Sequence, residues 1–445
     1  MDLQAALPPS VKWITETLED AGFETWVVGG AIRNLILGRT VEDWDLATQA
    51  KPEEIIAAFS RTVPIGIEHG TVGVLARDGT LYEVTTFRRD VKSLGRQAVV
   101  EFSADIGEDL ARRDFTFNAL AWHPLRQDLL DPTGGMADID AGVLRTVGDP
   151  EQRFSEDFLR VLRALRFSGQ FGLSIERETW IGLLGAVPGL ALLSPERVQQ
   201  EIMKVLAKAS RPSIALSLYL ESGALRTLYP ELDQPAEARV SGSEPDSFAR
   251  VLEICDGLKP IRPLVRLAVL FSLVRLAEGI GQNVGWAVES LMRRLRFSNA
   301  DTKRVSSVVT MYNMAPPATE PSELRQWLSR AGPDYYADVV RIWIAEARAV
   351  QGGSGSRTEK IVNRISMLRS ILKTCPPLSV SDLELDGTRL KELGLTPGPK
   401  FAEILAFLLE KVLERPELNN QGDLEALLGS GGFLSTPSSS GHEAP

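Results

Sequence analysis

The stretch WVVGGAIRNLILGRTVEDWDLAT, residues 26–48, decides how the first part of this 445-residue chain folds. A short apolar run leads to the pair Gly29 and Gly30, an apolar segment follows as far as Gly38, and two aspartates then stand one residue apart. This order predicts a buried strand, a glycine turn, a short helix and a second strand.

The neighbouring segments extend this pattern. Residues 11–21 and 52–60 have the spacing of helices, and TVGVLARDGTLYEVTTF contains two strand-like runs joined by Asp78 and Gly79, a hairpin signal. Amphipathic helices dominate from about Glu151 onward. We therefore predict an α+β fold, in which a mixed-sheet head is followed by an all-helical remainder.

Pro, Gly and Ser-rich stretches suggest where the helical part divides. The predicted boundaries are a head at 1–145, a neck at 146–232, a body at 233–350, a tail at 351–430 and a disordered end at 431–445.

Composition excludes several classes of protein. Hydrophobic residues make up 44% and charged residues 24%, which is usual for a soluble globular protein. No apolar run of membrane-spanning length or secretory signal is found, so we expect a cytoplasmic protein. Two distant cysteines and three histidines argue against a disulfide framework or a zinc site. Any catalytic metal should be held by carboxylates.

The aspartate pair is the first candidate site. Asp43 and Asp45 on one strand would point to the same face, where their charges repel unless a cation lies between them. With Gly29 and Gly30 exposing backbone amides just before a helix, the pair suits Mg²⁺ and a nucleoside triphosphate. The alternative is an ordinary surface DxD beside a turn.

Glu83 is a candidate third carboxylate, because it stands between apolar residues of the second hairpin strand. It would complete a site for two metal ions that activates a hydroxyl and stabilises departing pyrophosphate. Alternatively, Glu83 is only the charge of an edge strand.

The segment ARRDFTFNALAW is expected to set Asp114 and Asn118 one helical turn apart, directly after Arg112 and Arg113. The arginines would donate to triphosphate and ribose oxygens. A salt-bridged helix surface is the alternative.

In SEDFLRVLRALRF, Asp157 and Arg160 are expected to share one helix face away from the apolar stripe. An acceptor-only aspartate beside a donor-only arginine matches the pairing edges of cytosine and adenine and rejects those of uracil and guanine. The pair would then act as a protein template for two bases, unless it is only an exposed ion pair.

These motifs resemble a known family in their order along the chain. GGAIRNLILGR, DWD, RRDFTFNAL, LLDPTGG, TVGDPEQRFSEDFLRVLRALRF and SPERVQQEIMKVL are similar to the motifs of class II tRNA nucleotidyltransferases. That family comprises the CCA-adding enzymes and bacterial poly(A) polymerases of the polymerase-beta-like superfamily. The LGLTPGP turn near residue 395 resembles the C-terminal segment of bacterial members.

The resemblance implies a role for each matching residue. Two Mg²⁺ ions would be bound by Asp43 and Asp45, with Glu83 as the third carboxylate, and the substrates would be CTP and ATP. Residues implied to bind the nucleotide are Gly29, Gly30, Arg33, Arg112, Arg113, Asp114, Asn118, Asp157, Arg160 and Arg163. Those implied to brace the base-reading helix are Glu196, Arg197 and Glu201.

The chain departs from the family pattern at two places. Asn34 stands where the family usually has aspartate after the arginine of the first motif, so an ion pair is expected to be missing. The segment 88–102, predicted as a loop, lacks the usual acidic residue before Gly95 and Arg96, and this loop helps the family switch from C to A addition.

Basic clusters in the helical part are candidates for binding the acceptor arm of tRNA, although the net charge is −10. Solvated helix faces are the alternative. The candidates are Arg293, Arg294, Arg296, Lys303, Arg304, Lys360 and Arg364.

The predicted function is template-independent addition of CMP and AMP to the 3′ end of tRNA, by a monomer or weak dimer. Alternatives are a CC-only or A-only enzyme, a poly(A) polymerase, or a catalytically inactive RNA-binding protein. The poly(A) polymerase is disfavoured because the terminal segments of this sequence are not strongly basic.

Overall fold

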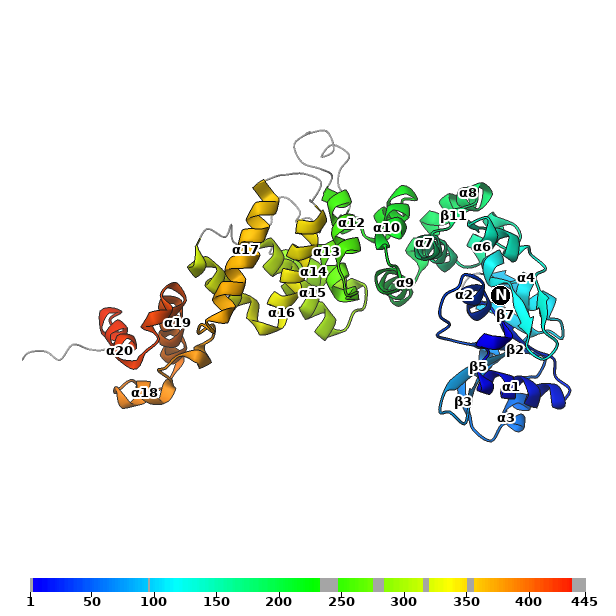
Figure 1. Ribbon diagram of the computed structural model, residues 1–445, viewed down its shortest axis with the longest axis horizontal. Coiled ribbons are helices and arrows are strands. Elements are labelled where there is room, and N and C mark those ends of the chain that lie inside the picture. The colour runs from blue at the N-terminus through cyan, green and yellow to red at the C-terminus, as the bar shows by residue number, and fades with distance from the viewer. Residues whose placement is uncertain are drawn as a thin grey trace, which may run out of the picture. The chain divides into compact units, whose positions relative to one another are not determined.

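The computed structural model describes residues 3–94, 97–232, 247–274, 284–314, 320–349 and 356–433. The chain divides into two compact units, Met1–Asp233 and Gln234–Pro445. Each unit is described by itself below, and Figure 1 shows their elements. The segment predicted to be a disordered end lies, from residue 434 onward, outside the described residues, as do the predicted boundaries near 233 and 351.

The first unit is built on a seven-stranded sheet with the order β3-β4-β5-β2-β1-β8-β9. The strand pair β2–β5 is parallel and the other pairs are antiparallel, so the predicted mixed sheet is confirmed. The strand bounds are β1 (Thr25–Val28), β2 (Asp45–Thr48), β3 (Thr62–Gly66), β4 (Thr71–Leu75), β5 (Leu81–Thr86), β8 (Ala121–His123) and β9 (Asp128–Leu130).

Helices α1 (Pro9–Asp20) and α3 (Pro52–Ala58) cover one face of this sheet. Alternation along β4 and β5 turns Val72, Val74 and Val84 into the protein, where all three are fully buried. Leu46 of β2 pairs with Val84 of β5, so these two side chains point to the same face of the sheet. Asp45 and Glu83 each come one residue earlier on their strands, and their side chains therefore point to the opposite face. The sheet therefore presents two carboxylates on neighbouring strands.

Part of that opposite face is closed by α4 (Ile106–Ala111), whose Ile106 and Leu110 pack with Trp26, Val28 and Phe87. The rest of the face stays open. Between β5 and α4 the chain forms a separate antiparallel pair, β6 (Arg88–Leu94) and β7 (Gln97–Phe102). The prediction of a loop at 88–102 was therefore wrong, because these residues pair with each other as strands.

The helices after the sheet are short, and α7 packs against both α9 and α10. A two-stranded parallel pair, β10 (Val143–Leu144) with β11 (Ser174–Ile175), interrupts the region expected to be all-helical. The helix bounds are α5 (Gly135–Asp140), α6 (Pro150–Glu156), α7 (Leu159–Phe171), α8 (Arg177–Ala186), α9 (Pro195–Lys208), α10 (Pro212–Glu221) and α11 (Ala224–Leu228).

The regular elements in the described residues of the second unit are all helices, and α16 contains a kink at Gly332, whose φ is +69°. Its bounds are α12 (Ser247–Gly257), α13 (Pro263–Phe271), α14 (Val284–Arg294), α15 (Asn299–Asn313), α16 (Pro321–Ala349), α17 (Ser356–Lys373), α18 (Gly387–Glu392), α19 (Pro399–Glu414) and α20 (Gln421–Ser430). Among the described helices, none combines the length and the apolar character needed to cross a membrane. The predicted α+β class, with a mixed-sheet head followed by helices, is confirmed.

Candidate active site

The open face of the sheet lines a cavity of about 700 Å³ in the first unit, which we call the first cavity. Its wall contains all ten residues predicted to bind a nucleotide, together with Asp45 and Glu83. These residues come from the sheet, from the turn before α2 (Gly30–Ile36), from the segment after α4 and from α7. The structure thus brings residues that are more than 100 positions apart into one wall.

Gly29 forms the turn at the edge of this cavity. Its φ is +68°, a conformation that favours glycine. A Cβ atom at this position would lie 2.8 Å from Nη1 of Arg113. Glycine is therefore required both by the backbone and by the close approach of the arginine.

Arg33 is the most deeply buried cation of the wall, with 8% of its surface exposed. Its Nη1 donates to Oδ1 of Asn118 at 2.5 Å, and Nε and Nη2 donate to Oδ1 of Asn34 at 3.2 and 2.9 Å. Burial lowers the pKa of Arg33 to about 10, with Asp114 opposing that shift. Arg33 therefore keeps its charge at neutral pH, and the neutral Asn34 side chain accepts its hydrogen bonds, so the ion pair expected to be missing here is indeed replaced by an amide.

Asp109 of α4 holds the two neighbouring arginines and was missed in the sequence. It accepts from Arg112 at 2.9 Å and from Arg113 at 3.0 Å, and only 2% of its side chain is exposed. Burial alone would raise the pKa of Asp109, but the two arginines more than offset this and the pKa is lowered. The spacing of three and four positions between an aspartate and the Arg112–Arg113 pair was the only local signal in the sequence.

Asp114 connects the sheet domain to α7. It accepts from Arg163 at 2.6 Å, from the Asn118 side chain at 3.1 Å and from the Phe115 amide at 2.9 Å. Burial raises its pKa, but Arg163 and these hydrogen bonds more than offset that effect, so the pKa is lowered and Asp114 is ionised.

The expected helix carrying both Asp114 and Asn118 was wrong, because α4 ends at Ala111 and only a 3₁₀ turn, Thr116–Asn118, follows. The two side chains nevertheless meet, through that turn.

Asp43 and Asp45, the two carboxylates of the DxD pair, differ in the cavities that they line. Asp45 lines the first cavity with Glu83, whereas Asp43 lines a second cavity of about 770 Å³ that Asp45 also borders. Strand β2 begins at Asp45, so the prediction that Asp43 lies on the same strand was wrong; it lies in the segment just before it. Both are exposed, while Trp44 between them is buried.

Electrostatics at Asp45 indicate a place for a cation. Although its side chain is still exposed, the surrounding protein displaces part of the water around Asp45 and so raises its pKa. Glu83 and Asp43 raise the pKa further, and Arg113 opposes the shift. A divalent cation would relieve this repulsion between carboxylates. Within the described residues, however, no three acidic, histidine or cysteine side chains are gathered closely enough to form a ready-made metal site.

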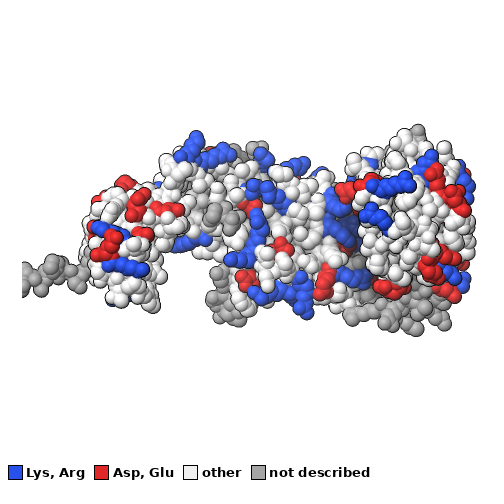
Figure 2. All heavy atoms as spheres, turned by 90° about the horizontal axis from the view of Figure 1, so that it is seen from below, with Lys and Arg blue, Asp and Glu red and all other residues white. Residues whose placement is uncertain are grey.

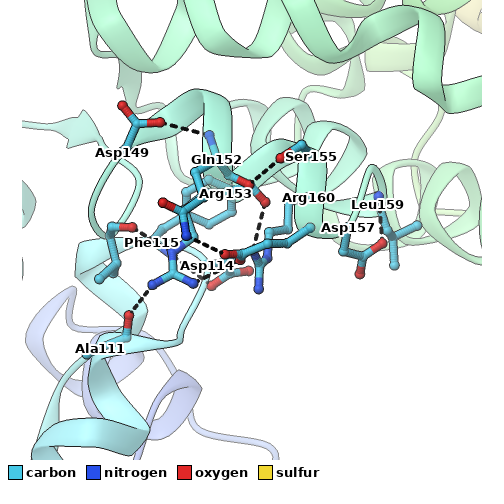
Figure 3. Close-up of polar contacts among 12 residues, drawn as sticks. Ala111, Asp114, Phe115, Asp149, Gln152, Arg153, Ser155, Asp157, Leu159 and Arg160 are labelled. Atoms are coloured by element: carbon cyan, nitrogen blue, oxygen red, sulfur yellow. Dashed lines mark hydrogen bonds and ion pairs between the residues drawn. The ribbon is translucent and has the colours of Figure 1, made fainter. Parts of the chain in front are cut away.

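Asp157 and Arg160 also line the first cavity, and Figure 3 shows them with the residues around them. The prediction that they share a helix face was wrong, because α6 ends at Glu156, Asp157 has an extended conformation, and α7 begins only at Leu159. Asp157 accepts from the Leu159 amide at 3.0 Å, and Arg160 donates to the Arg153 carbonyl at 2.7 Å. An acceptor and a donor group thus face the cavity from the junction of two helices.

Helix α9 braces this junction. Arg197 donates to Asp157 at 2.7 Å, and Glu201 accepts from Arg166 of α7 at 2.6 Å with 1% of its side chain exposed. Glu196 lies in the first turn of α9. Asp157 is therefore held from both sides, by the start of α7 and by α9.

The basic residues predicted to bind RNA lie in the second unit, where Figure 2 shows Lys and Arg side chains spread over one face with acidic residues between them. Arg293, Arg294, Arg296, Lys303 and Lys360 are exposed. Arg304 instead pairs with the buried Asp338, and the Arg364 guanidinium lies 4.8 Å from the Trp343 ring centroid. Lys303 and Arg304 border a further cavity with Arg262 and Tyr335, which the sequence did not suggest.

Comparison with known proteins gives two family matches. The poly A polymerase head domain matches residues 25–145, and the probable RNA and SrmB-binding site of polymerase A matches residues 172–234. The CCA-adding enzyme of Leuconostoc mesenteroides is 34% identical over 418 residues, which are 93% of this chain and 94% of that enzyme.

Two solved structures are also similar. The Bacillus stearothermophilus CCA-adding enzyme in complex with CTP has a TM-score of 0.74 at 26% identity, covering 96% of this chain and 99% of that one. The Thermotoga maritima CCA-adding enzyme complexed with tRNA has a TM-score of 0.66 at 20% identity, covering 96% and 97%, and at that identity shows the fold alone.

Proposed function

This chain belongs to the family of the CCA-adding enzymes, the class II tRNA nucleotidyltransferases, and we propose that it adds CMP and AMP to the 3′ end of tRNA from CTP and ATP without a nucleic-acid template. The observation that carries this proposal is the composition of the first cavity. Ten nucleotide-binding candidates and two carboxylates share one wall.

The lining of the first cavity supports a proposed position for each part of the nucleotide. We place the triphosphate against Gly29, Arg33 and Arg113. The two arginines are held by buried partners, so their side chains need no reordering when an anion binds. The base lies against Asp157 and Arg160, whose acceptor and donor groups match cytosine and adenine.

The reaction joins the RNA 3′ oxygen to the α-phosphorus of the nucleotide. The bond from that phosphorus to the oxygen of the departing pyrophosphate breaks, and the hydroxyl proton passes to solvent. Asp43, Asp45 and Glu83 would hold two Mg²⁺ ions, which supply charge stabilisation for the attacking and leaving oxygens. The arginines hold the leaving pyrophosphate in line with the hydroxyl.

An extension assay tests the proposal. Purified protein with Mg²⁺ is given tRNA transcripts that end before CCA, after C or after CC, each with CTP, ATP or both. Addition of C, C and A to the first transcript, followed by arrest, is expected. Arrest after CC, or activity only on the CC-ended transcript, would identify a partial enzyme, long A tails a poly(A) polymerase, and no incorporation an inactive RNA-binding protein.

A further inference from the structure

Three phenyl rings lie against the guanidinium of Arg33. Its Cζ atom is 4.4 Å from the ring centroid of Phe171, 5.4 Å from that of Phe167 and 5.5 Å from that of Phe117. Phe167 and Phe171 are one helical turn apart on α7, and their rings stack with centroids 5.8 Å apart. All three distances are within the range of about 6 Å in which a ring face attracts a cation.

Arg33 is held in this position by neutral groups. Its hydrogen bonds go to the side-chain oxygens of Asn34 and Asn118. Asp114, the acid that most raises its pKa, forms its ion pair with Arg163 instead, at 2.6 Å. Among the residues that the structure describes, no carboxylate forms an ion pair with Arg33. The rings therefore contribute the attraction that a carboxylate partner would otherwise supply.

The same hydrogen bonds leave part of the guanidinium available. An arginine carries five N–H groups, of which Nε has one and each Nη has two. Nε and Nη2 each use one on Asn34, and Nη1 uses one on Asn118. Within the described part of the chain, one N–H on each Nη is then left for a ligand. A Cβ atom on Gly30 would lie 3.5 Å from Nη2, so this end of Arg33 lies beside the glycine turn.

An aromatic ring holds a cation differently from a carboxylate. The face of the ring attracts the charge without accepting the N–H groups, which lie in the plane of the guanidinium. A carboxylate in its place would accept up to two of them and would neutralise the charge. Stacked rings can thus fix the position of an arginine while preserving its capacity to bind an anion.

Phe171 is the ring whose role can be tested most directly. It is the nearest of the three rings to Arg33, and the Arg39 guanidinium lies 4.7 Å from the same centroid. Phe117 and Phe167 are buried in the core, whereas Phe171 is half-buried. Replacement of Phe171 therefore disturbs the packing least.

We propose that Phe171 is a positioning residue for the nucleotide, whose ring holds Arg33 beside the glycine turn and leaves its charge and two N–H groups for the triphosphate. This inference rests on the proposed function, since the triphosphate is the ligand that this function places against Arg33. Arg33 lines both cavities, whereas Phe171 lines only the second. Phe171 therefore acts through Arg33 and does not touch the nucleotide.

Calorimetric titration of the full chain with CTP or ATP tests the assignment without a catalytic step, because no acceptor is present when tRNA is left out. Phe171→Leu keeps an apolar side chain but removes the ring. It is expected to weaken binding of both nucleotides about fivefold, since they share the triphosphate. Phe171→Tyr keeps the ring and should retain most of the affinity. Unchanged affinity in Phe171→Leu, or equal losses in Phe171→Leu and Phe171→Tyr, overturns the proposal.

A double-mutant cycle with Arg33→Met separates positioning from a purely structural role. If Phe171 acts through Arg33, Phe171→Leu should change the affinity for CTP by less than about twofold once Arg33 is replaced. A fivefold loss in both backgrounds overturns the proposal. Where Arg33→Met binds too weakly for calorimetry, the contrast between Phe171→Leu and Phe171→Tyr decides the question.

Phe23→Leu is the matched control. Phe23 is also a half-buried phenylalanine of the first unit, but it lines neither cavity. Its replacement should leave nucleotide binding unchanged, and a loss equal to that of Phe171→Leu overturns the proposal. The expected binding pattern without any transfer to tRNA would reject the proposed function and support this assignment, whereas no binding of CTP by the wild type would overturn both.

Discussion

The cations around the first cavity and those of the second unit are held in different ways. Arg33, Arg113 and Arg163 are buried or half-buried, and each donates to an amide or carboxylate of the same wall. Arg293 and Lys360 of the second unit are exposed on helix surfaces. The first set is fixed in advance of binding, whereas long exposed side chains can adjust to their ligand.

This difference teaches what each region can recognise. Fixed donors select a small ligand by the positions of its atoms, because little entropy remains to be lost on binding. Exposed cations on helices attract a backbone of phosphates wherever it runs, and their contribution is screened by salt. We therefore expect large effects on turnover from the first set and small, salt-dependent effects on tRNA affinity from the second.

The largest effect is expected at Asp45, the carboxylate that borders both cavities. Asp45→Asn should lower kcat about a thousandfold, because it removes about 4 kcal/mol of charge stabilisation through the metal ions. Tight binding of tRNA, measured by filter retention, should persist. Asp128→Asn on the edge strand β9 is the control; loss of tRNA binding in the Asp45 variant would make Asp45 a structural residue.

The next effect concerns stability. Glu201→Gln leaves Arg166, whose side chain is 7% exposed, without its carboxylate partner and should destabilise the first unit by about 3 kcal/mol in urea denaturation at pH 7. The exposed Glu178→Gln on α8 should change stability little.

The same pair predicts a pH dependence. Burial raises the pKa of Glu201, but Arg166 more than offsets this, so its pKa is lowered in the folded protein. The stabilisation is complete above the ordinary glutamate pKa of about 4.3 and is lost as pH falls through the lowered folded-state pKa. Wild type and Glu201→Gln should therefore converge in stability once pH falls below the lowered folded-state pKa of Glu201, and a constant gap would contradict this account.

Base selection should change by a smaller amount. Asp157→Ala removes the acceptor on the pairing edge and should reduce discrimination against UTP and GTP by about 10-fold to 100-fold, or about 1–3 kcal/mol. Arg197→Ala should have a weaker effect of the same kind, because Arg197 orients Asp157. Unchanged ratios of kcat/KM for the four nucleotides would remove the template role.

The smallest effect is expected in the second unit. Arg293→Ala combined with Lys360→Ala should raise the KM for tRNA about threefold and reduce the salt slope by about 1 to 2. The KM for a short CC-ended oligonucleotide should not change, since it lacks the acceptor-arm phosphates that these exposed cations are proposed to contact. An equal loss with the oligonucleotide would mean that these residues act through folding.

Sequence patterns predicted the elements well where a local signal was strong. The hairpin at Asp78 and Gly79 and the strand before Gly29 are present, because turn chemistry and apolar runs act over a few residues. The helix expected through Asp114 and the one through Asp157 are interrupted, because tertiary partners override local helical spacing. Asp109 was not predicted, since its importance depends on its burial beneath Arg112 and Arg113.

By itself the sequence determined the α+β class, the order of the motifs and the chemical types of the site residues, because periodicity, turn residues and charge are properties of neighbouring positions. Only the tertiary structure decided which side chains share a cavity, and that Asp45 borders both cavities whereas Asp43 borders only the second. These features depend on how segments that are distant in the sequence pack together. The spacing of neighbouring residues does not predict which side chains such packing buries or pairs.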